Sequence, residues 1–220
     1  MRRQRFVIIP TNGRECLDRC LAAIRPQVDM VVLIKTKEFV RHGHHPDPGL
    51  VSFQDYDGVN ISRWWNDGLF AAAEAVVKQD PGPTKWDVAI INDDVIVPEG
   101  WFDAISGSMR QLRAAAGCSG GTGRMPVLHT QPGPVPLDTR LQGFAFIVAG
   151  EFGLRANEEL RWYWSDDYMD WESRKLGGMV MIPDFHVEHL YPNQQVTAEM
   201  QVMIAEDGQK FVDLYGMRPW

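Results

Sequence analysis

The stretch RFVIIPTNGRECLDRCLAAI, residues 5–24, contains the pattern that decides the fold. Residues 6–9 form a short apolar run that ends at Pro10, which is typical of a buried strand. Leu17, Cys20, Leu21 and Ile24 then recur at helical spacing, and a second apolar run follows at residues 30–34. A strand, a helix and a second strand in this order favour an α/β fold with a parallel sheet.

The rest of the chain continues this alternation. Further strands are expected at residues 50–53, 86–91, 141–148 and 179–182, and further helices at 64–77, 101–116, 167–176 and 197–215. Residues 117–138 are rich in glycine and proline and predict a long loop. Because neither an internal repeat nor a linker is visible, we expect one domain over residues 1–220.

Composition limits the classes of function. The chain has 220 residues, with 45% apolar and 23% charged side chains, which suits a soluble domain with its own core. A net charge of −7 disfavours binding to polyanions over the whole surface and suits a site for a divalent cation. Three cysteines without a CxxC pair indicate neither a disulfide framework nor a zinc ribbon, and favour a cytoplasmic location. No segment has the length of a membrane span or the pattern of a signal peptide.

Three polar residues, Asn92, Asp93 and Asp94, directly follow the expected strand at 86–91. In open parallel sheets, ligands bind at the carboxyl ends of the strands. Adjacent carboxylates repel each other unless a cation offsets them, and Mn²⁺ or Mg²⁺ prefers oxygen ligands and bridges to phosphates. The alternative interpretation is an Asp-rich turn that caps the following helix.

A second acidic pair, Asp166 and Asp167, follows three aromatic residues at 162–164. A carboxylate beside aromatic rings can have a raised pKa and act as a general base. Helix capping alone also explains acidic residues at this position. His186 and His189 follow the last expected strand, and a histidine there suits either packing or a Mn²⁺ site.

Taken in order, these segments resemble family 2 glycosyltransferases, which have the GT-A fold, and the small size is similar to virus-encoded members. The matching segments are the turn at residues 10–14, the residues Asn60, Asn66 and Gly68, and the runs INDDVIVP at 91–98, QGFAF at 142–146, WSDDYMDWE at 164–172 with Arg174 and Gly177, and VEH at 187–189. The resemblance implies a GT-A-like fold with a mostly parallel central sheet flanked by helices. It divides the domain into a nucleotide-sugar half at 1–98, an acceptor and catalytic half at 99–195, and a C-terminal helix at 196–220.

The resemblance also implies a mechanism. A nucleotide-diphosphate sugar is the donor, and Mn²⁺ or Mg²⁺, held by Asp94 and His189, is the cofactor. Asp167, with Asp166 as the other candidate, removes a proton from the acceptor hydroxyl, so that the anomeric carbon is inverted. The expected substrate-binding residues are Pro10, Thr11, Asn12, Arg14, Asn66, Asn92, Asp93, Gly143, Phe144 and Trp164.

The chain departs from the family pattern at two places. Asn92 replaces the first residue of the Asp-x-Asp motif, which makes Asp94 the preferred metal ligand. Residues 35–37, Lys-Thr-Lys, replace the acidic residue after the second strand, with Asp55 or Asp57 as substitutes.

Two other classes of function remain open. A nucleotidyltransferase acting on sugar phosphates also places carboxylates at strand ends, but it more often has a glycine-rich, basic N-terminal loop. A carbohydrate-binding module would use the eight tryptophans but has no need of a strand–helix–strand start. The sequence identifies neither the sugar nor the nucleotide, and it leaves the acceptor open between a glycan, a protein, a lipid-linked intermediate and a modified nucleobase. It does not indicate the oligomeric state.

Overall fold

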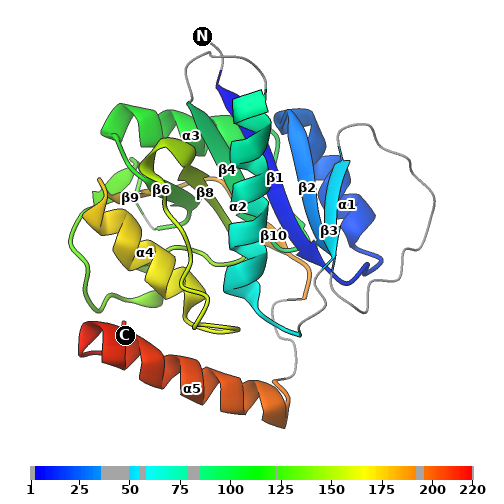
Figure 1. Cartoon of the computed structure of the whole chain (residues 1–220). Coiled ribbons are helices and arrows are strands. Elements are labelled where there is room, and N and C mark those ends of the chain that lie inside the picture. Colours follow the sequence, from blue (N-terminus) through cyan, green and yellow to red (C-terminus); the bar gives the residue numbers. More distant parts are fainter. Residues whose placement is uncertain are drawn as a thin grey trace.

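The computed structural model describes residues 3–35, 50–54 (backbone only), 58–78, 85–121, 123–191 and 196–219. Its centre is an eight-stranded sheet with the strand order β3-β2-β1-β4-β8-β6-β9-β7 (Figure 1). The strands are β1 Gln4–Thr11, β2 Met30–Lys35, β3 Leu50–Gln54, β4 Trp86–Ile91, β6 Ala116–Ser119, β7 Val127–His129, β8 Ala145–Ala149 and β9 Met179–Ile182. A separate two-stranded sheet pairs β5 Val95–Ile96 with β10 Glu188–His189.

The first half of the sheet is parallel. Strands β3, β2, β1 and β4 run the same way, with Phe6 opposite Met30 in one pair and opposite Val88 in the other. Strand β8 then runs antiparallel to both β4 and β6. The carboxyl ends of β1 and β4 therefore lie at one edge of the sheet, with Thr11 at the end of β1 and Asn92 just after β4.

Helices cover both faces of the sheet. They are α1 Leu17–Ile24, α2 Ile61–Lys78, α3 Trp101–Leu112, α4 Ser165–Lys175 and α5 Ala198–Tyr215. Figure 1 shows α2 and α4 in front of the sheet, with α1 and α3 behind it. Two buried clusters correspond to these layers: Trp65 of α2 and Met169 of α4 belong to one, and Cys20 of α1 and Phe102 of α3 to the other.

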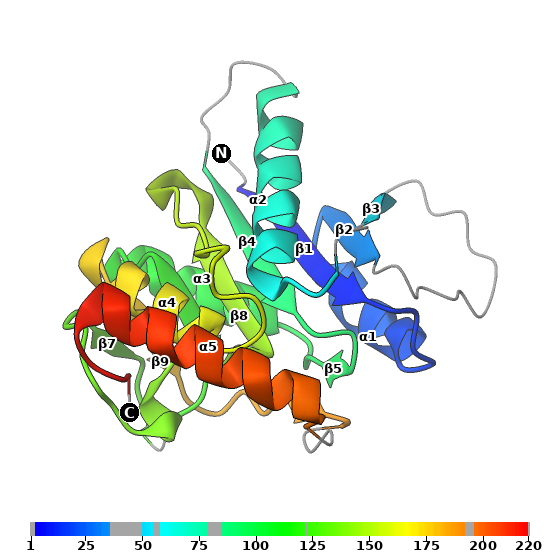
Figure 2. The ribbon, with the colours of Figure 1, turned by 60° about the horizontal axis from the view of Figure 1, so that its bottom comes forward.

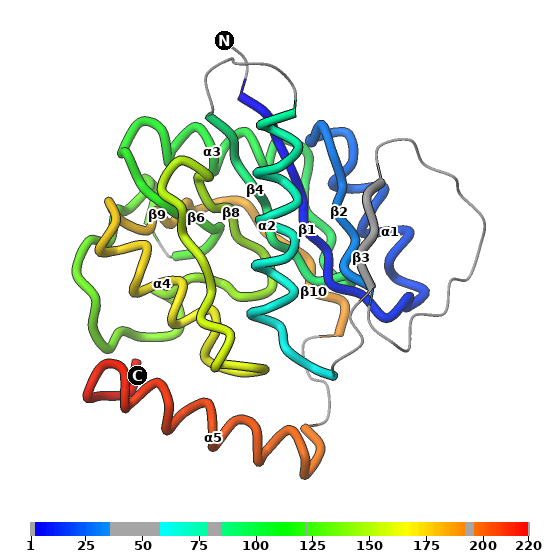
Figure 3. Tube along the Cα trace, in the orientation of Figure 1, coloured from blue at the N-terminus to red at the C-terminus, as the bar shows by residue number. Residues whose placement is uncertain are grey.

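Helix α5 lies outside these two layers. The chain leads from β9 past β10 before α5 begins (Figure 3), and Figure 2 shows α5 running alongside α4. Phe211 and Tyr215 of α5 pack edge-on against Trp171 of α4, with ring centroids 5.1 and 4.8 Å apart. Thr197 is the N-cap of α5, and its side chain accepts a hydrogen bond from the Met200 amide at 3.2 Å.

Most expected elements are confirmed, and several boundaries are corrected. The helix expected at 64–77 begins at Ile61. The helix expected at 101–116 ends at Leu112, because Arg113 adopts a left-handed conformation with φ of 57° and Ala116 starts β6. The expected loop at 117–138 therefore contains most of β6 and all of β7. The strand expected from residue 141 begins at Ala145, after a turn in which the Ala145 amide donates to the Gln142 carbonyl at 2.9 Å. Thr36, Lys37, Asp55 and Asp57 lie outside the described residues.

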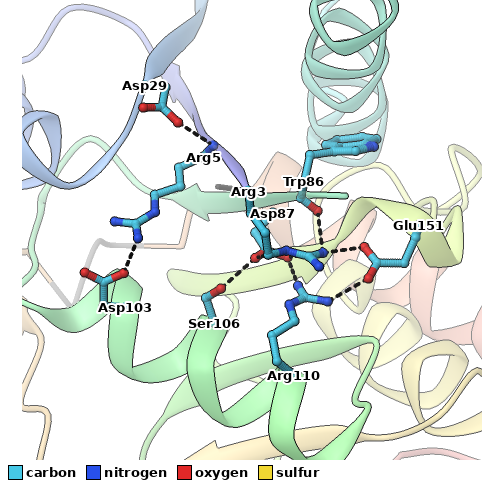
Figure 4. Close-up of polar contacts among 9 residues, drawn as sticks. All are labelled: Arg3, Arg5, Asp29, Trp86, Asp87, Asp103, Ser106, Arg110 and Glu151. Carbon is cyan, nitrogen blue, oxygen red and sulfur yellow. Dashed lines mark hydrogen bonds and ion pairs between the residues drawn. The ribbon is translucent and has the colours of Figure 1, made fainter. Parts of the chain in front are cut away.

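A cluster of ion pairs lies at the opposite edge of the sheet from the carboxyl ends of β1 and β4, where β4 begins (Figure 4). The carboxylate of Asp87 is fully buried and contacts Arg3 at 3.0 Å, the Ser106 hydroxyl at 2.6 Å and the guanidinium of Arg110. Glu151 bridges the two arginines at 2.6 and 2.7 Å. Two cations thus balance two carboxylates, which offsets the cost of burying Asp87.

A close approach beside this cluster gives a test of the packing. Gly150 lies so near the indole of Trp86 that a Cβ added there would overlap the ring. We expect Gly150→Ala to destabilise the protein by about 1–3 kcal/mol in chemical denaturation, since a buried ring cannot move away cheaply. Gly107, an exposed residue inside α3 with no atom within 4 Å of an added Cβ, is the matched control. Gly107→Ala should stabilise by roughly 0.5–1 kcal/mol; equal effects at the two positions would contradict the packing described.

Within the described residues, no helix combines the length and apolar character that a membrane crossing requires.

Candidate functional site

The turn after β1 meets the carboxylates that follow β4. The hydroxyl of Thr11 donates to Oδ2 of Asp93 at 2.7 Å and also accepts the Gly13 amide at 2.9 Å. Nε of Arg14 donates to Oδ1 of Asp93 at 2.9 Å, and Nη1 of Arg14 lies 3.1 Å from Oδ2 of Asp94. One cation therefore bridges two buried carboxylates, so part of the repulsion expected from the sequence is offset by Arg14.

The small sheet of β5 and β10 brings His189 to Asp94. Val95 pairs with His189 in this sheet, and the Leu190 amide donates to the carbonyl of Asp94 at 2.9 Å. Nε2 of His189 then lies 3.3 Å from Oδ1 of Asp94. Burial raises the pKa of Asp94, but its contacts with His189 and Arg14 lower it more, and the net pKa is below the ordinary value. Asp94 is thus held as a carboxylate.

Two residues connect this site to the second acidic pair. The carbonyl of Phe144 accepts the Asn92 amide at 2.9 Å, and its ring stacks on His189 with centroids 4.8 Å apart. The preceding Gly143 lies against Asp166: a Cβ there would come within 2.5 Å of the carboxylate. Glycine is therefore required for Asp166 to approach the backbone this closely.

The second acidic pair opens α4. Asp167 is 5% exposed and forms an ion pair with Arg140, which is 7% exposed. Burial, followed by the neighbouring charge of Asp166, raises the pKa of Asp167 to about 7. Burial also raises the pKa of Asp166, which is partly buried. A carboxyl group with a pKa near 7 suits proton transfer at neutral pH.

A third carboxylate lies deeper in α4. Asp170 pairs with Arg174 at 2.9 Å, both almost fully buried, and burial raises the pKa of Asp170 to about 6. Arg174 also donates to the carbonyls of Gln131 and Thr139, at 3.2 and 3.0 Å. This i, i+4 pair on α4 thus also anchors the segment that follows β7.

Helix α5 holds the aromatic segment that precedes α4. The buried carboxylate of Asp207 accepts the amides of Trp162 and Tyr163, at 2.8 and 3.0 Å. The indole of Trp164 donates to the Ile204 carbonyl at 3.1 Å and packs on Phe211 with centroids 5.8 Å apart. Trp164 is 4% exposed and lies in a hydrophobic cluster, whereas Tyr163 is 43% exposed.

The structure brings most of the expected site residues together. Asp93 contacts Thr11 and Arg14, and Asp94 contacts Arg14 and His189. Asn92, Gly143 and Phe144 connect this group to Asp166 and Asp167. Pro10 is partly buried near the end of β1, and Asn12 is exposed in the turn that follows. Asn66 lies elsewhere. Its side-chain amide donates to the carbonyl of Ala156 and accepts from the amide of the same residue.

Sequence reasoning missed two residues that shape the site. Arg140 lies outside every motif, yet it pairs with Asp167. Asp207 lies on α5, far along the chain, yet it orients the segment before Asp166. Neither contact has a local sequence signal, because each forms only when distant segments pack together.

Asp94 and His189 fit a metal ion as a pair of ligands. Oδ1 of Asp94 is buried without a hydrogen-bond partner within the described part of the chain, and it faces His189. The separation of 3.3 Å is close to the roughly 3 Å expected for two ligands at right angles around an ion about 2.1 Å away. The described residues contain no group of three or more acidic, histidine or cysteine side chains placed to hold an ion. A metal here would therefore need phosphate or water oxygens as further ligands, which is common for Mg²⁺.

Comparison with known proteins establishes the class of fold. The structure of residues 1–349 of S. aureus TarS is similar with a TM-score of 0.52 and 12% identity, covering 96% of this chain and 72% of that chain. Its complex with UDP-GlcNAc gives the same TM-score and identity, with 67% of that chain covered. A further TarS structure has a TM-score of 0.51 at 14% identity, covering 82% of this chain but 35% of that chain. No family model matches the sequence, and no curated protein matches it significantly. The chain therefore has the α/β fold of GT-A-like glycosyltransferases.

Proposed function

We propose that this protein is a glycosyltransferase that moves a sugar from a nucleotide diphosphate to an acceptor hydroxyl, with Mn²⁺ or Mg²⁺ as cofactor and with inversion. The observation that carries the proposal is the connection between two acidic groups at one sheet edge. Asp94, with Arg14 and His189, suits the donor's phosphates, and Asp166 and Asp167 suit the acceptor. The fold is that of proteins which include TarS, solved with UDP-GlcNAc, so uridine diphosphate sugars are the first donors to test.

On the donor side, the proposed residues bind the nucleotide and neutralise the charge of its diphosphate. The turn at residues 10–12 meets the nucleotide base, and Asn92 or Asp93 contacts the ribose. Asp94 and His189 would hold the ion, which would supply positive charge at the leaving diphosphate. Arg14 adds a second positive charge with a planar fork that matches phosphate oxygens.

On the acceptor side, Asp167 is the proposed base. With a pKa of about 7, its carboxylate accepts the hydroxyl proton as the oxygen attacks the anomeric carbon from the face opposite the diphosphate. Asp166 is the second candidate, because it is adjacent and more exposed. Attack on the opposite face inverts the configuration at that carbon.

A release assay tests this function. Uridine, guanosine and other nucleotide-diphosphate sugars are incubated with the protein, with and without Mn²⁺, and free nucleoside diphosphate is measured. A glycosyltransferase releases nucleoside diphosphate from one donor when Mn²⁺ is present, and an added acceptor increases the release. A nucleotidyltransferase would release no nucleoside diphosphate and would cleave the donor only with added pyrophosphate, giving nucleoside triphosphate and sugar phosphate. A carbohydrate-binding module would release nothing. Either result would contradict the proposal.

The pH dependence of kcat should show the effect of Arg140 on the pKa of Asp167. Because the base must be deprotonated, kcat should rise with pH through about 7 and level off above it. Arg140→Gln removes the cation that favours the charged form of Asp167, so the rising limb should move upward by roughly one pH unit or more. Arg140→Lys should leave the limb nearer its original place. If Arg140→Gln lowered kcat equally at every pH, a purely structural role would replace this positioning role.

A further inference from the structure

Arg14 occupies the position where a cation is needed between Asp93 and Asp94. Its guanidinium contacts both carboxylates, whose side chains are 3% and 2% exposed, while Arg14 itself is 27% exposed. Two buried adjacent carboxylates would repel each other strongly without this positive charge. Arg14 is therefore the counter-ion of the site as the structure shows it.

The two oxygens of Asp94 face different partners. Oδ2 lies 3.1 Å from Nη1 of Arg14, and Oδ1 lies 3.3 Å from Nε2 of His189 without a hydrogen bond. A divalent ion between Asp94 and His189 would thus share a carboxylate with the guanidinium. Like charges at such short range repel, so ion and guanidinium compete for Asp94.

The side chain of Arg14 is partly exposed and also has an aromatic neighbour. It lies in the turn between β1 and α1, outside any helix or strand, and its guanidinium carbon is 5.9 Å from the ring centroid of the exposed Tyr191. An aromatic face stabilises a guanidinium, and the structure shows this contact together with those to the two carboxylates. A planar guanidinium also binds phosphate with two parallel hydrogen bonds.

We infer that Arg14 is an exchangeable counter-ion: it neutralises Asp93 and Asp94 in the unloaded site and moves onto the donor's diphosphate when a divalent ion binds Asp94. The inference rests on the proposed function and adds to it how Arg14 responds when donor and ion bind. Without donor, Arg14 keeps the ion's affinity low. When donor is bound, its phosphates bind the guanidinium in place of the carboxylates. Donor and ion therefore strengthen each other's binding by the same factor.

Titration of Mn²⁺ against the protein, followed by the electron paramagnetic resonance signal of the free ion, tests the exchange without turnover. Arg14→Gln keeps a hydrogen-bonding side chain but removes the charge. In the absence of donor, Mn²⁺ should bind this variant at least about tenfold more tightly than the wild type, since a competing charge a few ångströms away is removed. The factor by which uridine diphosphate strengthens Mn²⁺ binding should shrink correspondingly.

The control is Arg19→Gln. Arg19 is a 61% exposed arginine on α1, 3.9 Å from Glu188, and its loss changes the net charge equally near the same sheet edge. Its Mn²⁺ affinity should stay within about twofold of the wild type, because exposed charges are screened. Asp94→Asn separates the two hypotheses: unchanged Mn²⁺ binding in that variant would refute the proposed metal site. Loss of binding in Asp94→Asn, combined with Mn²⁺ affinity in Arg14→Gln no higher than in the wild type, would overturn the exchange alone.

Discussion

Replacing Asp167 by Asn is expected to lower turnover by about 10²–10⁴-fold while donor binding stays intact. The amide keeps the size and much of the hydrogen bonding of the carboxylate but cannot accept a proton, and general-base catalysis contributes roughly this factor. Binding should survive, because Asp167 lies at the start of α4, apart from the contacts among Arg14, Asp94 and His189. Turnover is measured by nucleoside diphosphate release, and binding by calorimetric titration of the donor.

Asp166→Asn is the comparison for this variant. If Asp166→Asn lost transfer while Asp167→Asn kept it, the base would be Asp166. If Asp167→Asn lost donor binding together with turnover, the residue would have a structural role. Transfer that survived in both variants would contradict the proposed inverting base mechanism.

The second large effect is expected for Asp94→Ala, which should abolish metal-dependent donor binding. Asp94 provides the buried oxygen that faces His189, and a metal held by few protein ligands does not survive the loss of its carboxylate. Calorimetric titration of the donor, with and without Mn²⁺, measures the effect. The affinity with Mn²⁺ should fall to the value measured without it.

Asp213→Ala, which removes an exposed carboxylate from α5, is the control for net charge. It should leave donor affinity within about twofold of the wild type, since an exposed charge is screened by salt. An Asp94→Ala variant that is folded, as judged by its thermal unfolding, and that binds donor normally with Mn²⁺ would remove Asp94 from the metal site.

The parallel part of the fold was predictable because its signals are local. The apolar runs at β4 and β9 give the bounds Trp86–Ile91 and Met179–Ile182, as expected from the sequence. A buried strand needs a short apolar run with polar residues or glycine around it, and both strands have this pattern. The edge position of Asn92 and Thr11 then follows from the direction of parallel strands.

The corrected boundaries have a different cause. Residues 114–116 are all alanine, the strongest helix former, so the sequence extends α3 through them. In the structure, Ala114 and Ala115 lie beyond the left-handed Arg113, and the amides of Ala115 and Ala116 bond to Gly178 before β9. Pairing with a segment more than sixty residues away overrides local propensity here.

The candidate site likewise has a part that the sequence predicts and a part that it does not. Asp93, Asp94 and the acidic pair on α4 are visible in the sequence, because strand ends and helix starts place them. The contacts of Arg140 with Asp167 and of Arg14 with Asp94 depend on how distant segments meet, and no spacing along the chain encodes them. The expected role of Trp164 in substrate binding remains a proposal, with its indole packed on α5.

The most direct test of the proposed function is a crystal structure with Mn²⁺ and the nucleotide that the release assay selects. We expect the base against the turn formed by Pro10, Thr11 and Asn12, the ion between Asp94 and His189, and the diphosphate on that ion. A nucleotide bound elsewhere, with no ion at Asp94, would contradict the assignment of this sheet edge as the donor site.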